Sequence, residues 1–146
     1  MSYFMTISGL FDLPRSMAPI ELIPAHEAQQ YIQERESELT AIDGAPVHLV
    51  HDGTSGTSHD LIAQAEDHAQ KQGTLQGTLL FKLIEQAVAS GCAFRIWWAA
   101  DGPSLPVPTE CDSPGQAIRV LQDQIDAGSD LAVRYHPETR TAHCGA

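Results

Sequence analysis

The sequence predicts a single-domain α/β protein, a two-layer sandwich of about four mostly parallel strands with helices on one face. A length of 146 residues suits one domain. Apolar strand-like segments alternate with amphipathic helical segments, an order that favours parallel strands joined by right-handed crossovers. The strand-like segments alternate between apolar and polar residues, whereas strands covered on both faces are continuously apolar. We therefore expect a single layer of helices.

The amino-terminal part of the chain contains the first segments of this sandwich. Residues 1–18 are expected to be an arm or an edge segment, because their apolar residues are followed by a proline-containing linker. The α/β core domain then spans 19–136, beginning with a short strand over 20–23. A helix is expected over 25–40, with four acidic residues outside its apolar stripe. The segment 137–146 is predicted to be a polar carboxyl-terminal tail.

The middle of the chain contains one strand and two helices. Alternating apolar residues predict a strand over 47–51. After a loop rich in Gly, Ser and Thr, Ser58 is placed to N-cap a helix over 59–72. A second helix is expected over 74–90, because leucines and other apolar residues recur at helical spacing. Gly91 follows as its expected C′ residue.

The carboxyl-terminal half repeats the alternation of strands and helices. The aromatic-rich segment 93–99 predicts a strand, followed by a long loop over 100–113. Ser113 is the expected N-cap of a helix that starts at a proline and ends at Gly128. A last strand is expected over 131–135.

The charge of the chain is strongly negative and unevenly distributed. It has 19 acidic and 8 basic residues, a net charge of −11. Residues 1–70 hold 11 acids and 2 bases (−9), and residues 71–146 hold 8 acids and 6 bases (−2). A negative field repels nucleic acid and anionic membranes and attracts basic partners. The sequence therefore favours a basic protein partner, with no nucleic acid and no membrane.

Two sets of residues are candidates for binding that partner. The first is an acidic cluster near one helix end, made of Glu34, Glu36, Glu38 and Asp43. The second would lie on an open face of the sheet and combines a Trp with cationic side chains, a composition typical of binding hot spots: Arg95, Trp97, Arg134 and His136. In the alternative interpretation, residues 1–17 cover this face and Trp97 belongs to the core.

A different candidate site is a crevice between the loops 52–60 and 100–113. In parallel α/β sheets ligands bind at the carboxyl ends of strands, and both loops follow a predicted strand. Free N–H groups at the start of the helix over 59–72 could hold a phosphate. The expected lining of the crevice is Asp52, Thr57, His59, Asp101, Thr109 and Cys111. His59 would be the general base, because its unperturbed pKa lies near neutrality.

These observations lead to two functional hypotheses. The first is a small, non-enzymatic, cytoplasmic interaction protein of the inhibitor, immunity or adaptor type. The alternative is a small-molecule or phosphate-binding protein, or a small enzyme, that uses the crevice. A second copy of the chain is a further candidate partner, through an exposed strand edge or sheet face.

Cysteine and histidine usage bears on the compartment and on cofactors. Three widely spaced cysteines without a CxxC motif favour a reducing compartment, and no stretch approaches the length of a membrane span. His51, Asp52 and His59 lie close in sequence, but their spacing matches no established metal motif. We therefore expect no metal and no cofactor.

Overall fold

The computed structural model describes residues 2–9, 11–24, 27, 47–54, 57–99 and 107–137. Within them the chain forms, in order, β1 (Ser2–Ser8), the 3-10 helix η1 (Arg15–Met17), β2 (Glu21–Pro24), β3 (Val47–His51), α3 (His59–Gln72), α4 (Leu79–Ala89), β4 (Ala93–Ala99), β5 (Thr109–Cys111), α5 (Pro114–Ala127) and β6 (Ala132–Tyr135). The α/β class is therefore confirmed. The helix expected over 25–40 lies outside the described residues apart from residue 27, as does the predicted tail beyond residue 137.

The strands form one sheet that is mostly antiparallel. Its six strands have the order β2-β3-β1-β4-β6-β5. β1 is antiparallel to both β3 and β4, and the pairs β2–β3 and β4–β6 are also antiparallel. Only the β5–β6 pair is parallel among the described strands. The prediction of about four mostly parallel strands was therefore wrong.

The reason for this error lies at the amino terminus. Residues 2–8 are not an arm or an edge segment, because β1 is hydrogen-bonded to a strand on each side. Met5 and Ile7 on this strand are fully buried. Since β1 lies between β3 and β4, those two strands do not pair with each other, and the simple β-α-β crossover that the segment order predicted does not form.

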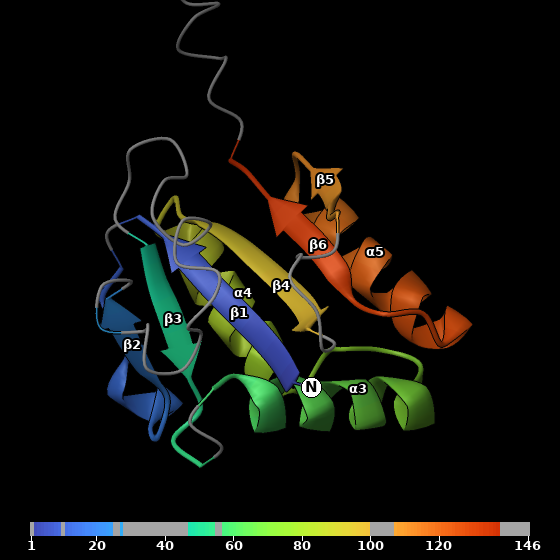
Figure 1. Cartoon of the computed structure of the whole chain (residues 1–146), viewed down its shortest axis with the longest axis horizontal. Helices are drawn as coiled ribbons and strands as arrows, with labels where there is room; N and C mark the ends of the chain where they lie inside the picture. The colour runs from blue at the N-terminus through green and yellow to red at the C-terminus, as the bar shows by residue number, and fades with distance from the viewer. Residues whose placement is uncertain are drawn as a thin grey trace, which may run out of the picture.

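The helices α3, α4 and α5 pack on one face of this sheet (Figure 1). Side chains of this face form the main core with the helices, including Ile7 of β1, Ile96 of β4 and Val133 of β6. From α4 and α5, Leu83 and Leu121 complete it. Within the described residues, the three α-helices therefore lie on one face of the sheet.

The opposite face of the sheet is also buried over its central strands, in agreement with the alternative that placed Trp97 in the core. Directly opposed residues of neighbouring strands share a face, so Phe4 lies beside Trp97, and Thr6 lies between Leu49 and Arg95. Trp97 is 2% exposed and Leu49 is fully buried. The expected open sheet face is therefore not present over these central strands.

The helix ends follow the local capping signals closely, with one exception. The helices α3 and α5 have the predicted starts and stops, and Gly73 and Gly128 terminate them in left-handed conformations. The exception is α4, which starts at Leu79 rather than near Thr74. Within the segment expected as a loop over 100–113, residues 109–111 form β5. No helix in the described part of the chain combines the length and apolar character needed to cross a membrane.

Candidate functional site

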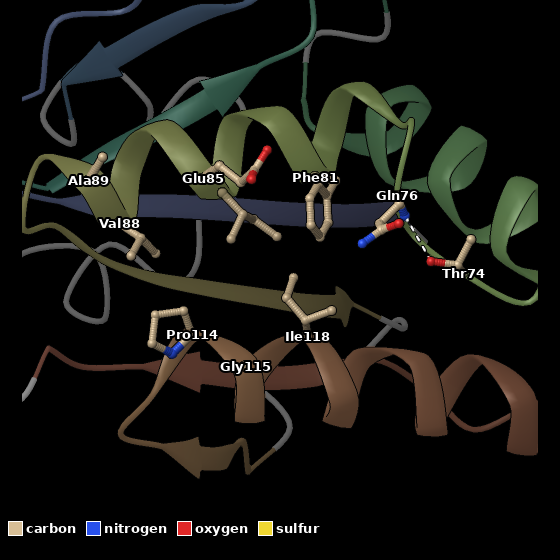
Figure 2. A pocket seen from close by; sticks show the side chains of 10 residues that line it. Thr74, Gln76, Phe81, Glu85, Val88, Ala89, Pro114, Gly115 and Ile118 are labelled. Atoms are coloured by element: carbon tan, nitrogen blue, oxygen red, sulfur yellow. Dashed lines mark hydrogen bonds between the residues drawn. The ribbon is translucent and has the colours of Figure 1, made fainter.

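The concave feature that stands out is an apolar groove of about 510 Å³ between α4 and α5. Figure 2 shows Phe81 and Val88 of α4 and Ile118 of α5 projecting into the space between the two helices. Ile84 is buried in the groove, whereas those three side chains are half-buried. We name this feature the α4–α5 groove. Its lining residues are Thr74, Gln76, Phe81, Ile84, Glu85, Val88, Ala89, Pro114, Gly115 and Ile118.

The ends and the rim of the groove carry its few polar groups. Thr74 and Gln76 lie at one end, where the Gln76 N–H donates to Thr74 Oγ1 at 3.1 Å. At the other end Ala89 and Gly115 are exposed and small. Glu85 is exposed at the rim and is the only charged residue among the described lining. The groove therefore offers apolar surface with one carboxylate beside it.

The sequence contained a signal for this groove, which the sequence analysis did not use. The helix α4 is apolar over more of its surface than one buried stripe needs, because Phe81 and Val88 accompany the buried Leu80, Leu83, Ile84 and Ala87. An apolar arc this wide indicates a helix that covers the core on one side and borders a second apolar surface on another.

The loop 52–60 is a capped turn built around Asp52. Asp52 is 6% exposed, and its Oδ2 accepts from the N–H groups of Asp60 at 2.8 Å and Leu61 at 3.4 Å. Its Oδ1 accepts from Thr54 N at 2.9 Å and from Thr54 Oγ1 at 3.1 Å. The N–H groups that would hold a phosphate at the start of α3 thus already bind a carboxylate of the chain itself.

The other polar residues at the start of α3 are also engaged. Ser58 is the N-cap residue by position but makes no capping hydrogen bond; its Oγ accepts from Met5 N at 2.9 Å and donates to the Val50 carbonyl. His59 Nδ1 accepts from Tyr3 N at 3.2 Å, and its ring stacks on the Tyr3 ring at 5.5 Å. The proposed general base is therefore part of the contact between β1 and α3.

The phenol of Tyr3 completes this contact. Tyr3 donates a hydrogen bond to Glu66 Oε2 at 2.7 Å, and its ring meets Trp98 edge to face at 4.7 Å between centroids. Burial, followed by the hydrogen bond to Glu66, raises the pKa of Tyr3 above its ordinary value. The hydrogen bond from the phenol to Glu66 ties β1 to α3.

The predicted crevice residues do not come together in the part of the chain that the structure describes. Thr109 and Cys111 lie on β5 at one edge of the sheet, whereas Asp52, whose N–H donates to the Thr57 carbonyl, follows β3, four strand positions away. At about 4.8 Å per strand, the separation of β3 from β5 is about 19 Å. His59 lies against Tyr3 of β1 and Trp98 of β4, two strand positions from β5. Asp101 lies outside the described residues.

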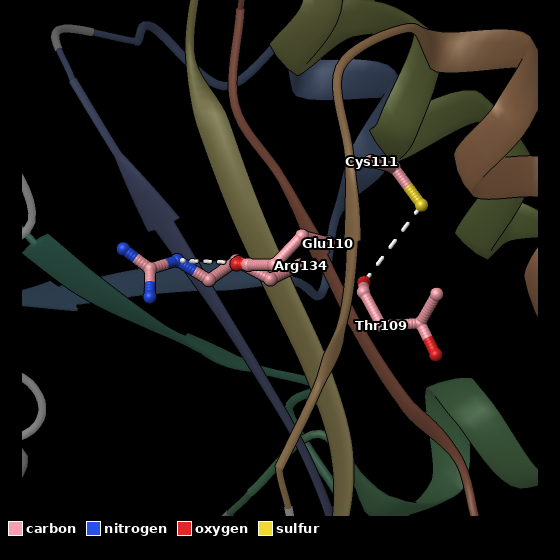
Figure 3. Close-up of polar contacts among 4 residues, drawn as sticks. All are labelled: Thr109, Glu110, Cys111 and Arg134. Atoms are coloured by element: carbon pink, nitrogen blue, oxygen red, sulfur yellow. Dashed lines mark hydrogen bonds and ion pairs between the residues drawn. The ribbon is translucent and has the colours of Figure 1, made fainter.

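Cys111 is poorly suited to nucleophilic chemistry. It is 3% exposed, and burial raises the pKa of its thiol, to which the carboxylates of Glu110 and Asp112 add. Figure 3 shows its Sγ directed towards the Thr109 carbonyl, 3.8 Å away, while Glu110 reaches Arg134 on the neighbouring strand. The residues of β5 therefore contribute to the pairing of β5 with β6.

The second set of predicted partner-binding residues is divided between the interior of the sheet and its β5–β6 edge. These residues are Arg95, Trp97, Arg134 and His136. Trp97 is a core residue that stacks on Phe4 at 5.6 Å, and the Arg95 guanidinium lies 5.4 Å from its ring centroid. Arg134 pairs with Glu110 at 3.5 Å, and His136 donates its backbone N–H to Cys111. The first set, Glu34, Glu36, Glu38 and Asp43, lies outside the described residues.

The described residues contain no group of three or more His, Cys, Asp and Glu side chains arranged to hold a metal ion. His51, Asp52 and His59, which lie close in sequence, accept hydrogen bonds from backbone N–H groups. His51 Nδ1 accepts from Gly53 N at 3.0 Å, while Asp52 and His59 bind backbone N–H groups as described above.

Comparison with known proteins identifies no relative of this chain. No protein-family model, no curated protein and no solved structure matches this chain. The α4–α5 groove is therefore the candidate site on the strength of its geometry alone.

Proposed function

We propose that this chain is a non-enzymatic interaction protein of the inhibitor, immunity or adaptor type, and that a basic protein partner docks in the α4–α5 groove. The observation that carries this proposal is the groove itself: an open apolar groove of about 510 Å³ between two helices of a chain with a net charge of −11. Exposed apolar surface rimmed by polar residues is typical of protein interaction sites.

A protein partner fits the groove better than a small molecule does. Ligand pockets carry several convergent polar groups that orient the ligand and bury most of its surface. In this groove the uncharged polar side chains are confined to the Thr74 and Gln76 end, and the walls are half-exposed. An apolar segment of a partner protein needs no convergent polar groups in the groove, because the rest of the partner orients the segment.

Charge favours a basic partner over a neutral or acidic one. The negative field of the chain accelerates the encounter with a positive surface and makes the association sensitive to salt. The same field disfavours nucleic acid and anionic membranes. We keep the cytoplasm as the proposed compartment, because three widely spaced cysteines without a CxxC motif favour a reducing environment.

The crevice alternative receives no comparable support. The N–H groups of Asp60 and Leu61 are occupied by Asp52, and the candidate general base His59 accepts from Tyr3 N and stacks on the Tyr3 ring. Enzymatic function would need these groups to be available to a substrate.

The test uses two variants that make the same change in charge. Ala89→Lys places a cation in the groove, and Gln70→Lys places one on an exposed position of α3 that does not line it. Tagged wild-type chain is expected to capture a basic protein from its source cells at low salt and to release it at high salt. Gln70→Lys should retain this protein and Ala89→Lys should lose most of it, with equal melting temperatures. Equal capture by both variants would contradict the proposed docking site.

A further inference from the structure

We propose that Gln124 keeps the segment 107–108 off the edge of the sheet, and that this segment is poised to extend β5 along β6 when Gln124 releases Ala132. The device is a competition between two acceptors, the Gln124 side chain and the Val107 carbonyl, for one backbone N–H group. It is independent of the docking function proposed above, because it concerns the edge of the sheet beside α5 (Figure 1).

The side chain of Gln124 takes the place of a neighbouring strand beside Ala132. The Ala132 N–H donates to Gln124 Oε1 at 2.9 Å, and Gln124 Nε2 donates to the Ala132 carbonyl at 3.2 Å. Trp98 N of β4 donates to the Leu131 carbonyl at 2.8 Å, so the backbone groups of the next residue, Ala132, face away from β4. The amide of Gln124 therefore binds β6 from the side on which β5 lies.

The register of β5 on β6 identifies the group that Gln124 displaces. The two strands are parallel, and His136 N donates to the Cys111 carbonyl at 3.1 Å. Backbone groups that face the same neighbour recur at every second residue of each strand. The same ladder, carried back along both strands, places the Ala132 N–H opposite the Val107 carbonyl. Gln124 Oε1 holds this N–H instead, and β5 begins only at residue 109.

Val107 and Pro108 both suit a strand at this edge. Among the described residues, Val107 is the large apolar side chain that lies exposed, at 91%. Side chains alternate along a strand, so in a longer β5 Val107 would share a face with the buried Cys111, on the side of the sheet that carries the helices. Pro108 has no N–H, and in this register its nitrogen would face away from β6, where a sheet edge tolerates proline. Extension of β5 would therefore cover apolar surface of Val107 without needing a donor from Pro108.

The two arrangements exclude each other, because Ala132 has a single N–H to donate. With Gln124 bound, β5 is short and Val107 lies on the surface, as in the described structure. With Val107 bound, β5 is longer and the amide of Gln124 is released. Since Gln124 belongs to α5, the length of β5 is coupled to the position of this helix.

The experiment identifies the acceptor of the Ala132 N–H by NMR in the isotope-labelled full chain. Scalar coupling across the hydrogen bond connects the Ala132 nitrogen to the carbonyl carbon of its acceptor. In the wild type we expect coupling to the side-chain carbonyl of Gln124 and none to Val107. Gln124→Met removes the amide but keeps a long side chain that suits a helix, and it should give coupling to Val107. Hydrogen exchange of the Ala132 amide should then stay within about threefold of the wild-type rate.

Two control variants separate the competition from a general effect on α5. Gln124→Glu keeps an oxygen acceptor for the Ala132 N–H, so it should keep the wild-type arrangement and show no coupling to Val107. Gln122→Met makes the same change on the same helix, where the amide donates to Asp126 Oδ1 at 2.9 Å and does not touch β6. It should leave the acceptor of the Ala132 N–H unchanged.

Two outcomes would overturn the inference. If Gln124→Met shows no coupling to Val107 and its Ala132 amide exchanges about tenfold faster or more, the segment 107–108 does not replace the side chain. Coupling between Ala132 and Val107 in the wild type would show that β5 is already extended and that Gln124 does not compete. If Gln124→Met lacks the amide dispersion of a folded chain, Gln124→Ala decides between the same two results, because it removes the acceptor with a smaller side chain.

Discussion

The residue that contributes most to the organisation of the β3–α3 junction is Asp52. Sequence analysis placed it in the lining of a ligand crevice, next to N–H groups that could hold a phosphate. In the folded chain its carboxylate binds those groups itself, at 2.8 Å from Asp60 N and 3.4 Å from Leu61 N. A negative charge at a helix N-terminus is also favoured by the helix dipole. Asp52 is therefore a structural residue of the turn.

Replacing Asp52 by Ala should destabilise the protein by about 1–3 kcal/mol, because the substitution removes the cap of α3 and leaves buried donors without an acceptor. The free energy of unfolding, from urea titration followed by circular dichroism, measures this loss. Asp67→Ala is the control: Asp67 forms an exposed ion pair with Lys71 at 3.0 Å, so its removal should change the stability by less than about 0.5 kcal/mol. Similar losses for both variants would contradict the capping role.

Burial is a residue-scale property that the strand pattern left open. Trp97 and Arg95 were candidates for an exposed binding surface, with Trp97 in the core as the alternative; Trp97 is 2% exposed and Arg95 is 9% exposed. Strand alternation correctly put them on the face opposite Phe94 and Ile96. It could not indicate whether that face is covered, because coverage depends on segments distant in sequence.

At the scale of single elements, the end of α3 and both boundaries of α5 could be predicted because their signals are local. Ser113, the following proline and the terminal Gly128 determine the ends of α5 through the chain's own backbone and side chains. The start of α4 was predicted five residues too early. Gly77 adopts a positive φ of 88°, which ends any helical path through residues 74–77, and the helix begins after it.

The position of this helix start can be tested with two threonines. Thr78 Oγ1 accepts from Phe81 N at 3.1 Å as the N-cap of α4, whereas Thr74 Oγ1 accepts from Gln76 N within an exposed turn. We expect Thr78→Ala to lower the free energy of unfolding by about 1 kcal/mol and Thr74→Ala to lower it by less than about 0.5 kcal/mol. Thermal and urea unfolding of both variants give the comparison. The reverse order would place the functional cap at Thr74.

At the scale of the whole molecule, the pairing of strands was not accessible from the local sequence. The order of segments suggested parallel crossovers, but the insertion of β1 between β3 and β4 makes most pairs antiparallel. A strand's own residues determine which side chains share a face, and they do not identify the neighbour. That neighbour is selected by the burial of the complete core, to which Met5 and Ile7 contribute.

This topology makes the amino-terminal strand necessary for folding. A chain beginning at Met17 would lack β1, leaving β3 and β4 without their shared partner and removing two fully buried side chains. We expect it to lose cooperative unfolding and amide dispersion in NMR spectra, measured beside the 146-residue chain. A cooperative transition in the shortened chain would show that β1 is dispensable.

The sequence by itself determined the α/β class, most of the described helix ends and the excess of negative charge. All of these depend on composition or on residues within a few positions of each other. Only the tertiary structure decided the antiparallel pairing, the burial of Trp97, the separation of the predicted crevice residues and the α4–α5 groove. These features depend on which distant segments meet. The free energy that selects those contacts comes from burying apolar surface of the whole chain at once, and no local pattern contains it.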